Sequence, residues 1–176
     1  MKHHSIPFNR FRYPVGDNIG HNAPYFRKLV EQFSEIAEED IIKYNRMTLV
    51  CQGSSGSIVA TIFYLYLTEK YPKICINIVT IKKDNESSHS TKFTSIPYNY
   101  DNKVMYVWVD DHIDQGDTIK RCRNRYVECD SSYSNFLFDW AVCLSSEYSL
   151  SESKQLEFFE TVTKNMVCNI GRYCSN

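Results

Sequence analysis

The sequence lacks any long hydrophobic run, and no window approaches the roughly 18 to 20 consecutive apolar residues that cross a bilayer. The opening stretch MKHHSIPFNRFRYP lacks an apolar run of signal-peptide length as well. The seven cysteines include no CxxC pair, which favours free thiols over disulfides and argues against a structural zinc site. We therefore expect a cytoplasmic protein without a membrane partner.

An excess of positive charge is also absent, because 20 lysines and arginines stand against 21 aspartates and glutamates, a formal net charge of −1. Broad contact with a nucleic-acid backbone needs such an excess, so the sequence gives no strong nucleic-acid signal. What is present is an ordinary globular composition, 43% hydrophobic and 23% charged. We expect one domain over residues 1–176, in which residues 1–21 form an irregular lead-in.

Expected helices and strands alternate along the chain. Apolar residues recur every three or four positions between Asn22 and Tyr44, which predicts an amphipathic helix there. Short apolar, β-branched runs predict strands, and longer periodic segments predict helices. The strands are expected at 47–51, 74–81, 104–109, 136–144 and 166–170, and the remaining helices at 57–71, 117–128 and 151–165. This order predicts an α/β fold with a mostly parallel central sheet flanked by helices, in which ligands bind at the carboxyl ends of the strands.

The third expected strand, VMYVWV, ends in two carboxylates, Asp110 and Asp111. At a fraying strand end, both can reach one ligand, typically vicinal hydroxyls or a divalent cation with its waters. A helix then opens at Gly116, Asp117 and Thr118, and its free backbone N–H groups form a natural anion site. The combination predicts a ribose-phosphate site. The alternative, an acidic pair that simply leaves the sheet before a turn, is not excluded by spacing alone.

The first two expected strands also end in residues that suit an anion. The stretch QGSSGS, residues 52–57, follows the first strand, and its glycines allow backbone amides to approach an anion at a helix N-terminus. Many ordinary strand–helix turns look the same. Lys82 and Lys83 follow the second strand, where a basic pair is more often solvated charge. Residues 82–97 are polar, lack periodicity and are expected to form a loop.

The stretch VWVDDHIDQGDT, residues 107–118, resembles the signature of the type I phosphoribosyltransferases: an apolar strand, two acidic residues and a short loop ending in Ser or Thr. The resemblance implies that Asp110 and Asp111 bind the ribose hydroxyls of phosphoribosyl pyrophosphate (PRPP) together with Mg²⁺. It implies that Asp114 is catalytic, lying near the purine N7 and accepting a proton from the base. The implied 5′-phosphate loop consists of Asp114, Gln115, Gly116, Asp117 and Thr118.

The same resemblance assigns the two other strand ends to the pyrophosphate. The implied pyrophosphate loop consists of Gly53, Ser54, Ser55, Gly56 and Ser57. Lys82 would bind the substrate and Lys83 would act in catalysis by neutralising the leaving group. The polar segment after them would be a flexible hood, with His89 as a further candidate. The implied reaction transfers ribose 5-phosphate from PRPP to a purine-like nitrogenous base and releases pyrophosphate. The partners would be PRPP and a nucleobase. A homodimer is one alternative, because the sequence does not determine the oligomeric state.

One departure from the family pattern concerns the phosphate loop. Asp117 stands where the family has glycine or another small or basic residue, and Gln115 replaces the usual threonine. A carboxylate in this loop repels a phosphate dianion, unless it points outward as a helix N-terminal residue, where negative charge is favourable. A second hypothesis therefore stands beside the enzyme: a non-catalytic relative that binds PRPP or a nucleotide and acts through a partner.

Overall fold

The computed structural model describes residues 2–5, 23–83, 100–113, 116–146 and 157–168. Their strands form one six-stranded sheet in the order β1-β6-β5-β4-β2-β3, and every neighbouring pair is parallel. The strands are β1 (Lys2–Ser5), β2 (Arg46–Gln52), β3 (Cys75–Ile81), β4 (Val104–Ile113), β5 (Phe138–Ser146) and β6 (Thr163–Cys168). Parallel neighbours require crossover connections, which helices supply here. The predicted α/β class with a parallel central sheet is confirmed.

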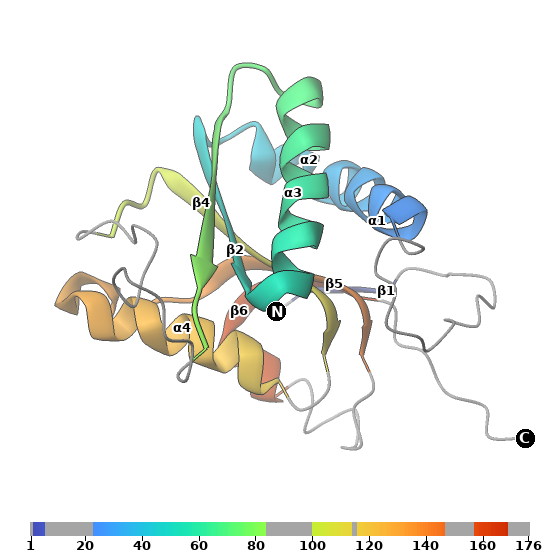
Figure 1. Ribbon diagram of the computed structural model, residues 1–176. Coiled ribbons are helices and arrows are strands. Elements are labelled where there is room, and N and C mark those ends of the chain that lie inside the picture. Colours follow the sequence, from blue (N-terminus) through green and yellow to red (C-terminus); the bar gives the residue numbers. More distant parts are fainter. Residues whose placement is uncertain (1, 6–22, 84–99, 114–115, 147–156, 169–176) are drawn as a thin grey trace, which may run out of the picture.

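Helices cover both faces of the sheet (Figure 1). The described elements are α1 (Ala23–Ile36), α2 (Glu38–Ile41), α3 (Gly53–Lys70), α4 (Asp117–Cys129) and the short 3₁₀ helix η2 (Ser131–Tyr133). α1 and α3 pack on one face, and α4 packs on the other. None of the described helices combines the length and apolar character needed to cross a bilayer.

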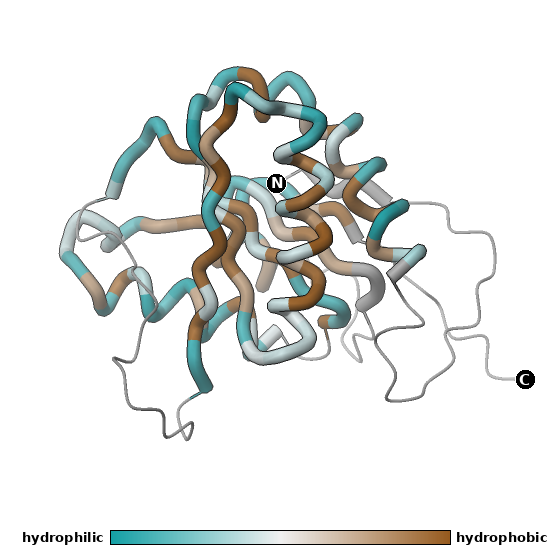
Figure 2. Tube along the Cα trace, turned by 45° about the horizontal axis from the view of Figure 1, so that its top comes forward, coloured by the Kyte–Doolittle hydropathy of each residue, from teal (hydrophilic) through white to brown (hydrophobic). Residues whose placement is uncertain are grey.

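The alternation of side chains along β4 divides the core into two layers. Met105, Val107 and Val109 are buried with α1 and α3, whereas Tyr106 and Trp108 are buried with α4. Both sets of side chains are therefore removed from water, and Figure 2 shows hydrophobic colouring along the strands and along α3. β4 lies between β5 and β2, so its end is held on both sides by neighbouring strands.

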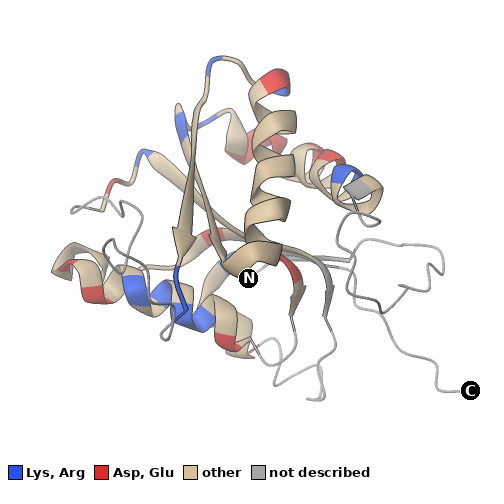
Figure 3. Ribbon diagram, viewed as in Figure 1, with Lys and Arg blue, Asp and Glu red and all other residues tan. Residues whose placement is uncertain are grey.

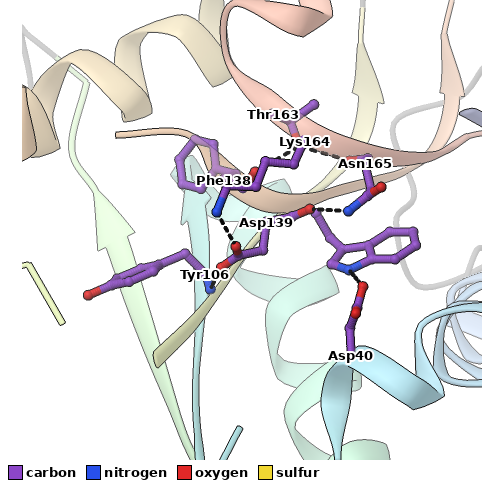
Figure 4. Close-up of polar contacts among 8 residues, drawn as sticks. Asp40, Tyr106, Phe138, Asp139, Thr163, Lys164 and Asn165 are labelled. Carbon is purple, nitrogen blue, oxygen red and sulfur yellow. Dashed lines mark hydrogen bonds and ion pairs between the residues drawn. The ribbon is translucent and has the colours of Figure 1, made fainter. Parts of the chain in front are cut away.

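A buried aspartate ties three strands together at the amino end of the sheet (Figure 4). Asp139 is 7% exposed, and its carboxylate accepts hydrogen bonds from the backbone N–H of Tyr106 (2.8 Å) and from Nζ of Lys164 (2.7 Å). Its carbonyl oxygen accepts a further hydrogen bond from Asn165. Polar groups thus join β4, β5 and β6 where the sheet begins.

Several expected boundaries at the ends of the chain are wrong. Residues 2–5 are not irregular, because they form the edge strand β1 beside β6. The expected helix at 151–165 extends too far toward the C-terminus, because Thr163–Asn165 belong to β6. β6 pairs with both β5 and β1, and this long-range pairing overrides the local helical pattern. The predicted start of that helix lies outside the described residues.

Three central elements also differ from expectation. The helix expected from Asn22 to Tyr44 is divided into α1 and α2 at Ala37, whose φ of −96° and ψ of 7° lie outside the helical range. α3 begins at Gly53 rather than at residue 57, so the expected glycine–serine loop is the first turn of a helix. β4 continues to Ile113, which places Asp110 and Asp111 inside the strand.

Candidate functional site

A cleft of about 550 Å³ opens at the carboxyl ends of β2, β3 and β4. It collects residues from three separate stretches of the sequence, as expected for a ligand site in a parallel α/β sheet. The predicted residues that line it are Gly53, Ser54, Ser55, Lys83, Asp110, Asp111, Gly116, Asp117 and Thr118. The structure therefore brings the acidic pair, the glycine–serine stretch and the start of α4 to one cavity.

The first turn of α3 forms one wall of this cleft. Gly53 has a φ of +69°, and a Cβ at this position would lie 3.3 Å from Cε of Lys83. The lysine side chain thus passes directly over the glycine. A Cβ at Gly56 would lie 3.1 Å from Cβ of Cys51 and 3.5 Å from Oδ1 of Asp110. Both glycines allow a helix N-terminus, with its unpaired backbone N–H groups, to approach the cleft and the acidic pair closely.

The acidic pair at the end of β4 is unequal in burial. Asp110 is 6% exposed, and Asp111 is intermediate. Oδ1 of Asp110 accepts a hydrogen bond from the backbone N–H of Asp111 (3.0 Å). Burial, followed by the hydrogen bond and charge of the Asp111 side chain, raises the pKa of Asp110 to about 8, against the opposing influence of that backbone N–H and of Lys83. A cation beside the pair would relieve this unfavourable charge.

The N-terminus of α4 forms the opposite wall. Gly116 precedes the helix with a φ of +77°, a left-handed conformation that favours glycine. Asp117 is the first helical residue; it is exposed but still lines the cleft. Figure 3 shows a series of basic residues along α4, which carries Lys120, Arg121, Arg123 and Arg125. Negative charge at Asp117 is thus followed by positive charge within about one turn of helix.

The residues present suit a magnesium ion that is shared with a substrate. The described part of the chain contains no group of three or more His, Cys, Asp or Glu side chains able to hold a metal. Mg²⁺, however, usually binds through one or two carboxylates together with waters and substrate phosphates. Asp110 and Asp111 line the same cleft and would supply those carboxylates.

No protein-family model and no curated protein matches the chain. Solved structures do. Hypoxanthine phosphoribosyltransferase from Trypanosoma cruzi aligns with a TM-score of 0.52 and 10% identity, over 93% of this chain and 76% of that one. Adenine phosphoribosyltransferase from Saccharomyces cerevisiae aligns with a TM-score of 0.50 and 17% identity, over 92% and 90%. The chain has the type I phosphoribosyltransferase fold.

In this phosphoribosyltransferase fold, some predicted residues lie away from the cleft or outside the described chain. Gly56 is buried, and the hydroxyl of Ser57 donates to the carbonyl oxygen of Gly53 (2.7 Å), so neither lines the cavity. Lys82 does not line it either. Asp114, Gln115 and the hood residue His89 lie outside the described residues, and their roles stay predictions.

The cleft also contains residues to which the resemblance assigns no role. These are Gln52, Trp108, His112, Ile113 and Ile119. Gln52 had a signal, because it directly precedes the glycine–serine stretch at a strand end. His112 had one as well, because it directly follows the acidic pair. Trp108, Ile113 and Ile119 had none, since an aromatic or β-branched residue in a strand or helix is far more often part of the core.

Proposed function

We propose that the protein is a phosphoribosyltransferase that transfers ribose 5-phosphate from PRPP to a purine-like nitrogenous base and releases pyrophosphate. One observation carries the proposal: a single cleft at three strand ends combines a carboxylate pair with two helix N-termini and a lysine. Carboxylates suit ribose hydroxyls, and helix N-termini suit phosphates. The two solved structures named above are described as a hypoxanthine and an adenine phosphoribosyltransferase.

In this proposal, Asp110 and Asp111 accept hydrogen bonds from the ribose 2′- and 3′-hydroxyls. The N-terminus of α4, from Gly116 to Thr118, binds the 5′-phosphate through its backbone N–H groups. The first turn of α3 and Lys83 bind the pyrophosphate on the other side of the acidic pair. The sugar carbon C1 is thereby held between the departing pyrophosphate and the incoming base.

The reaction breaks the bond between C1 and pyrophosphate and forms a bond between C1 and a ring nitrogen of the base. Negative charge grows on the leaving group, and the backbone N–H groups of Gly53 to Ser55 and the Lys83 ammonium stabilise it. Asp114 accepts the proton that the base nitrogen loses. Mg²⁺, held by Asp110 and Asp111 with the pyrophosphate, would supply further neutralisation of the leaving group.

Asp117 favours a second function, a non-catalytic protein that binds PRPP or a nucleotide and acts through a partner. Its exposed carboxylate lines the cleft at the α4 N-terminus, where the enzyme proposal requires a phosphate. Repulsion between the two weakens binding without altering the rest of the site.

An assay with isotope-labelled PRPP and Mg²⁺ against a panel of purine and pyrimidine bases tests the proposal. We expect formation of a labelled nucleotide with at least one base and release of pyrophosphate in equal amount. Binding of PRPP or a nucleotide by calorimetry, without pyrophosphate release with any base, would support the non-catalytic function instead. Absence of both would contradict both functions.

A further inference from the structure

A buried glutamine at the end of β2 connects three elements that border the cleft: β2, the residues after β3, and α4. Gln52 is 4% exposed, and its Oε1 accepts a hydrogen bond from the guanidinium of Arg121 (2.9 Å). Its Nε2 donates to the carbonyl oxygen of Lys82 (3.3 Å). The orientation of the amide is determined by its partners, because arginine only donates and a carbonyl only accepts.

Each of these contacts reaches a different element. Gln52 is the last residue of β2 and the N-cap of α3, so its backbone leads directly into Gly53. Lys82 follows β3 and precedes Lys83, whose side chain passes over Gly53. Arg121 lies on α4, four residues after Asp117. One side-chain amide therefore joins the α3 wall, the lysine and the α4 wall.

We infer that Gln52 is a positioning residue for the pyrophosphate part of the cleft, and that Arg121 on α4 anchors it. The inference rests on the proposed function. Gln52 holds the Lys82 carbonyl at a fixed distance from the start of α3, and this sets where Lys83 stands relative to the α3 amides. Arg121 fixes the orientation of the amide through one charge-assisted hydrogen bond. Loss of either partner leaves buried polar groups without their bond and loosens the lysine from the helix N-terminus.

Calorimetric titration with inorganic pyrophosphate and with PRPP, each with Mg²⁺, tests this inference on the full chain. Gln52→Met keeps side-chain length but removes both hydrogen bonds, and Arg121→Met removes the anchor. We expect each to weaken pyrophosphate binding about 10-fold, the effect of losing a charge-assisted hydrogen bond. Arg121→Lys restores a donor and should bind within about 3-fold of the wild type.

Arg125→Met is the matched control, because Arg125 lies one turn further along α4 and pairs with Glu128. It removes the same charge without touching Gln52, and we expect binding within about 2-fold of the wild type, since Arg125 does not line the cleft and dissolved salt screens its charge at that distance. The double variant Gln52→Met, Arg121→Met should bind no more weakly than Gln52→Met alone, because the hydrogen bond that Arg121→Met removes is already lost in Gln52→Met.

The outcomes separate this inference from the proposed function. Wild-type protein that binds neither pyrophosphate nor PRPP would overturn both. Wild-type binding together with an Arg121→Met variant that matches Arg125→Met would overturn the positioning role alone. Circular dichroism and thermal melting verify that each variant is folded. If Gln52→Met does not fold, the comparison of Arg121→Met, Arg121→Lys and Arg125→Met decides the question by itself.

Discussion

The two ends of the central sheet each bury an aspartate at similar exposure, 7% for Asp139 at the amino end and 6% for Asp110 at the carboxyl end. Asp139 accepts hydrogen bonds from a backbone N–H and from the Lys164 ammonium. Asp110 accepts one from the backbone N–H of Asp111, whose own carboxylate is a second negative charge beside it. The cost of burying a carboxylate is thus offset by hydrogen bonds and an opposite charge at Asp139, and only partly offset at Asp110.

The pKa values of groups at the two ends follow this difference. Burial alone lowers the pKa of Lys164, but the hydrogen bond and charge of Asp139 raise it above its ordinary value, as in a matched ion pair. Burial and Asp111 raise the pKa of Asp110 to about 8. One buried carboxylate is hydrogen-bonded to a lysine ammonium, whereas the other has a second carboxylate beside it, and an external cation would balance the charge of that second pair. The comparison therefore supports a ligand site at the carboxyl end and a structural role at the amino end.

The largest expected effect is on stability at the amino end. Asp139→Ala leaves the Tyr106 N–H buried without its acceptor and Lys164 without its partner. We expect the free energy of unfolding, measured by urea denaturation, to fall by about 2 to 3 kcal/mol, chiefly because a buried N–H loses its acceptor. The loss of the pair with Lys164, whose side chain is exposed, adds less. Asp139→Asn keeps an acceptor for Tyr106 and should lose about half as much. We expect folded Asp139→Asn to bind PRPP as the wild type does, which would mean that the amino end has a structural role only. A specific loss of PRPP affinity in this variant would contradict the distinction between the two ends.

Asp110→Asn tests the carboxyl end through its pH dependence. Because the pKa of Asp110 is raised in the folded state, the folded protein binds the extra proton, and stability is lost as pH rises from about 4 to about 8. The slope is at most about 1.4 kcal/mol per pH unit for one group. Asparagine removes this slope, so Asp110→Asn should unfold at higher urea than the wild type at pH 8 but not at pH 4.

The same variant should lose PRPP affinity, which distinguishes a ligand site from a merely strained one. Asp139→Asn is the matched control, because it makes the same chemical change at the other end of the sheet. A wild-type stability that does not fall between pH 5 and pH 8 more steeply than that of Asp110→Asn would refute the raised pKa.

The sequence predicted the central elements well because their signals are local. Apolar β-branched runs at 74–81 and 104–109 predicted β3 and β4, and the alternation of helices and strands predicted the parallel sheet. β1 could not be predicted in this way. KHHS has no strand pattern, and these residues are a strand because β6 pairs with them from the far end of the chain. The same long-range pairing explains why the helix expected at 151–165 does not reach residue 165.

For the candidate site, chemical type was easier to predict than geometry. The sequence alone predicts a carboxylate pair at a strand end and a glycine–serine stretch before a helix. The structure brings both to one cleft. The contact between Arg121 and Gln52 joins residues far apart in the chain, so spacing carries no sign of it. The partial burial of the Asp110–Asp111 pair depends likewise on β4 continuing beyond the apolar run.

Gly53→Ala is expected to cost less stability than Asp139→Ala. A φ of +69° disfavours any residue with a Cβ, and the added methyl would contact Cε of Lys83 at 3.3 Å. We expect a loss of about 1 to 2 kcal/mol in the free energy of unfolding. Pyrophosphate affinity should fall as well, since the lysine is displaced from the α3 N-terminus. Ser54→Ala, an exposed position in the same turn, is the control and should change stability little.

Asp117→Asn has the smallest expected effect on stability and addresses the carboxyl end most directly. An exposed acid in the first turn of a helix contributes about 0.5 kcal/mol through the helix dipole, and the variant should lose this amount. The change also removes a negative charge from the wall that receives the 5′-phosphate in the proposed function. We therefore expect PRPP and ribose 5-phosphate to bind several-fold more tightly, most clearly at low ionic strength.

Glu128→Gln, near the end of the same helix, removes an equal charge far from that wall and serves as the control. Tighter binding in Asp117→Asn alone would mean that the carboxyl end is short of positive charge even where it is exposed, in agreement with the raised pKa of Asp110. Equal affinities in wild type, Asp117→Asn and Glu128→Gln would instead mean that Asp117 faces away from the bound phosphate. The objection that this residue raises against turnover would then no longer stand.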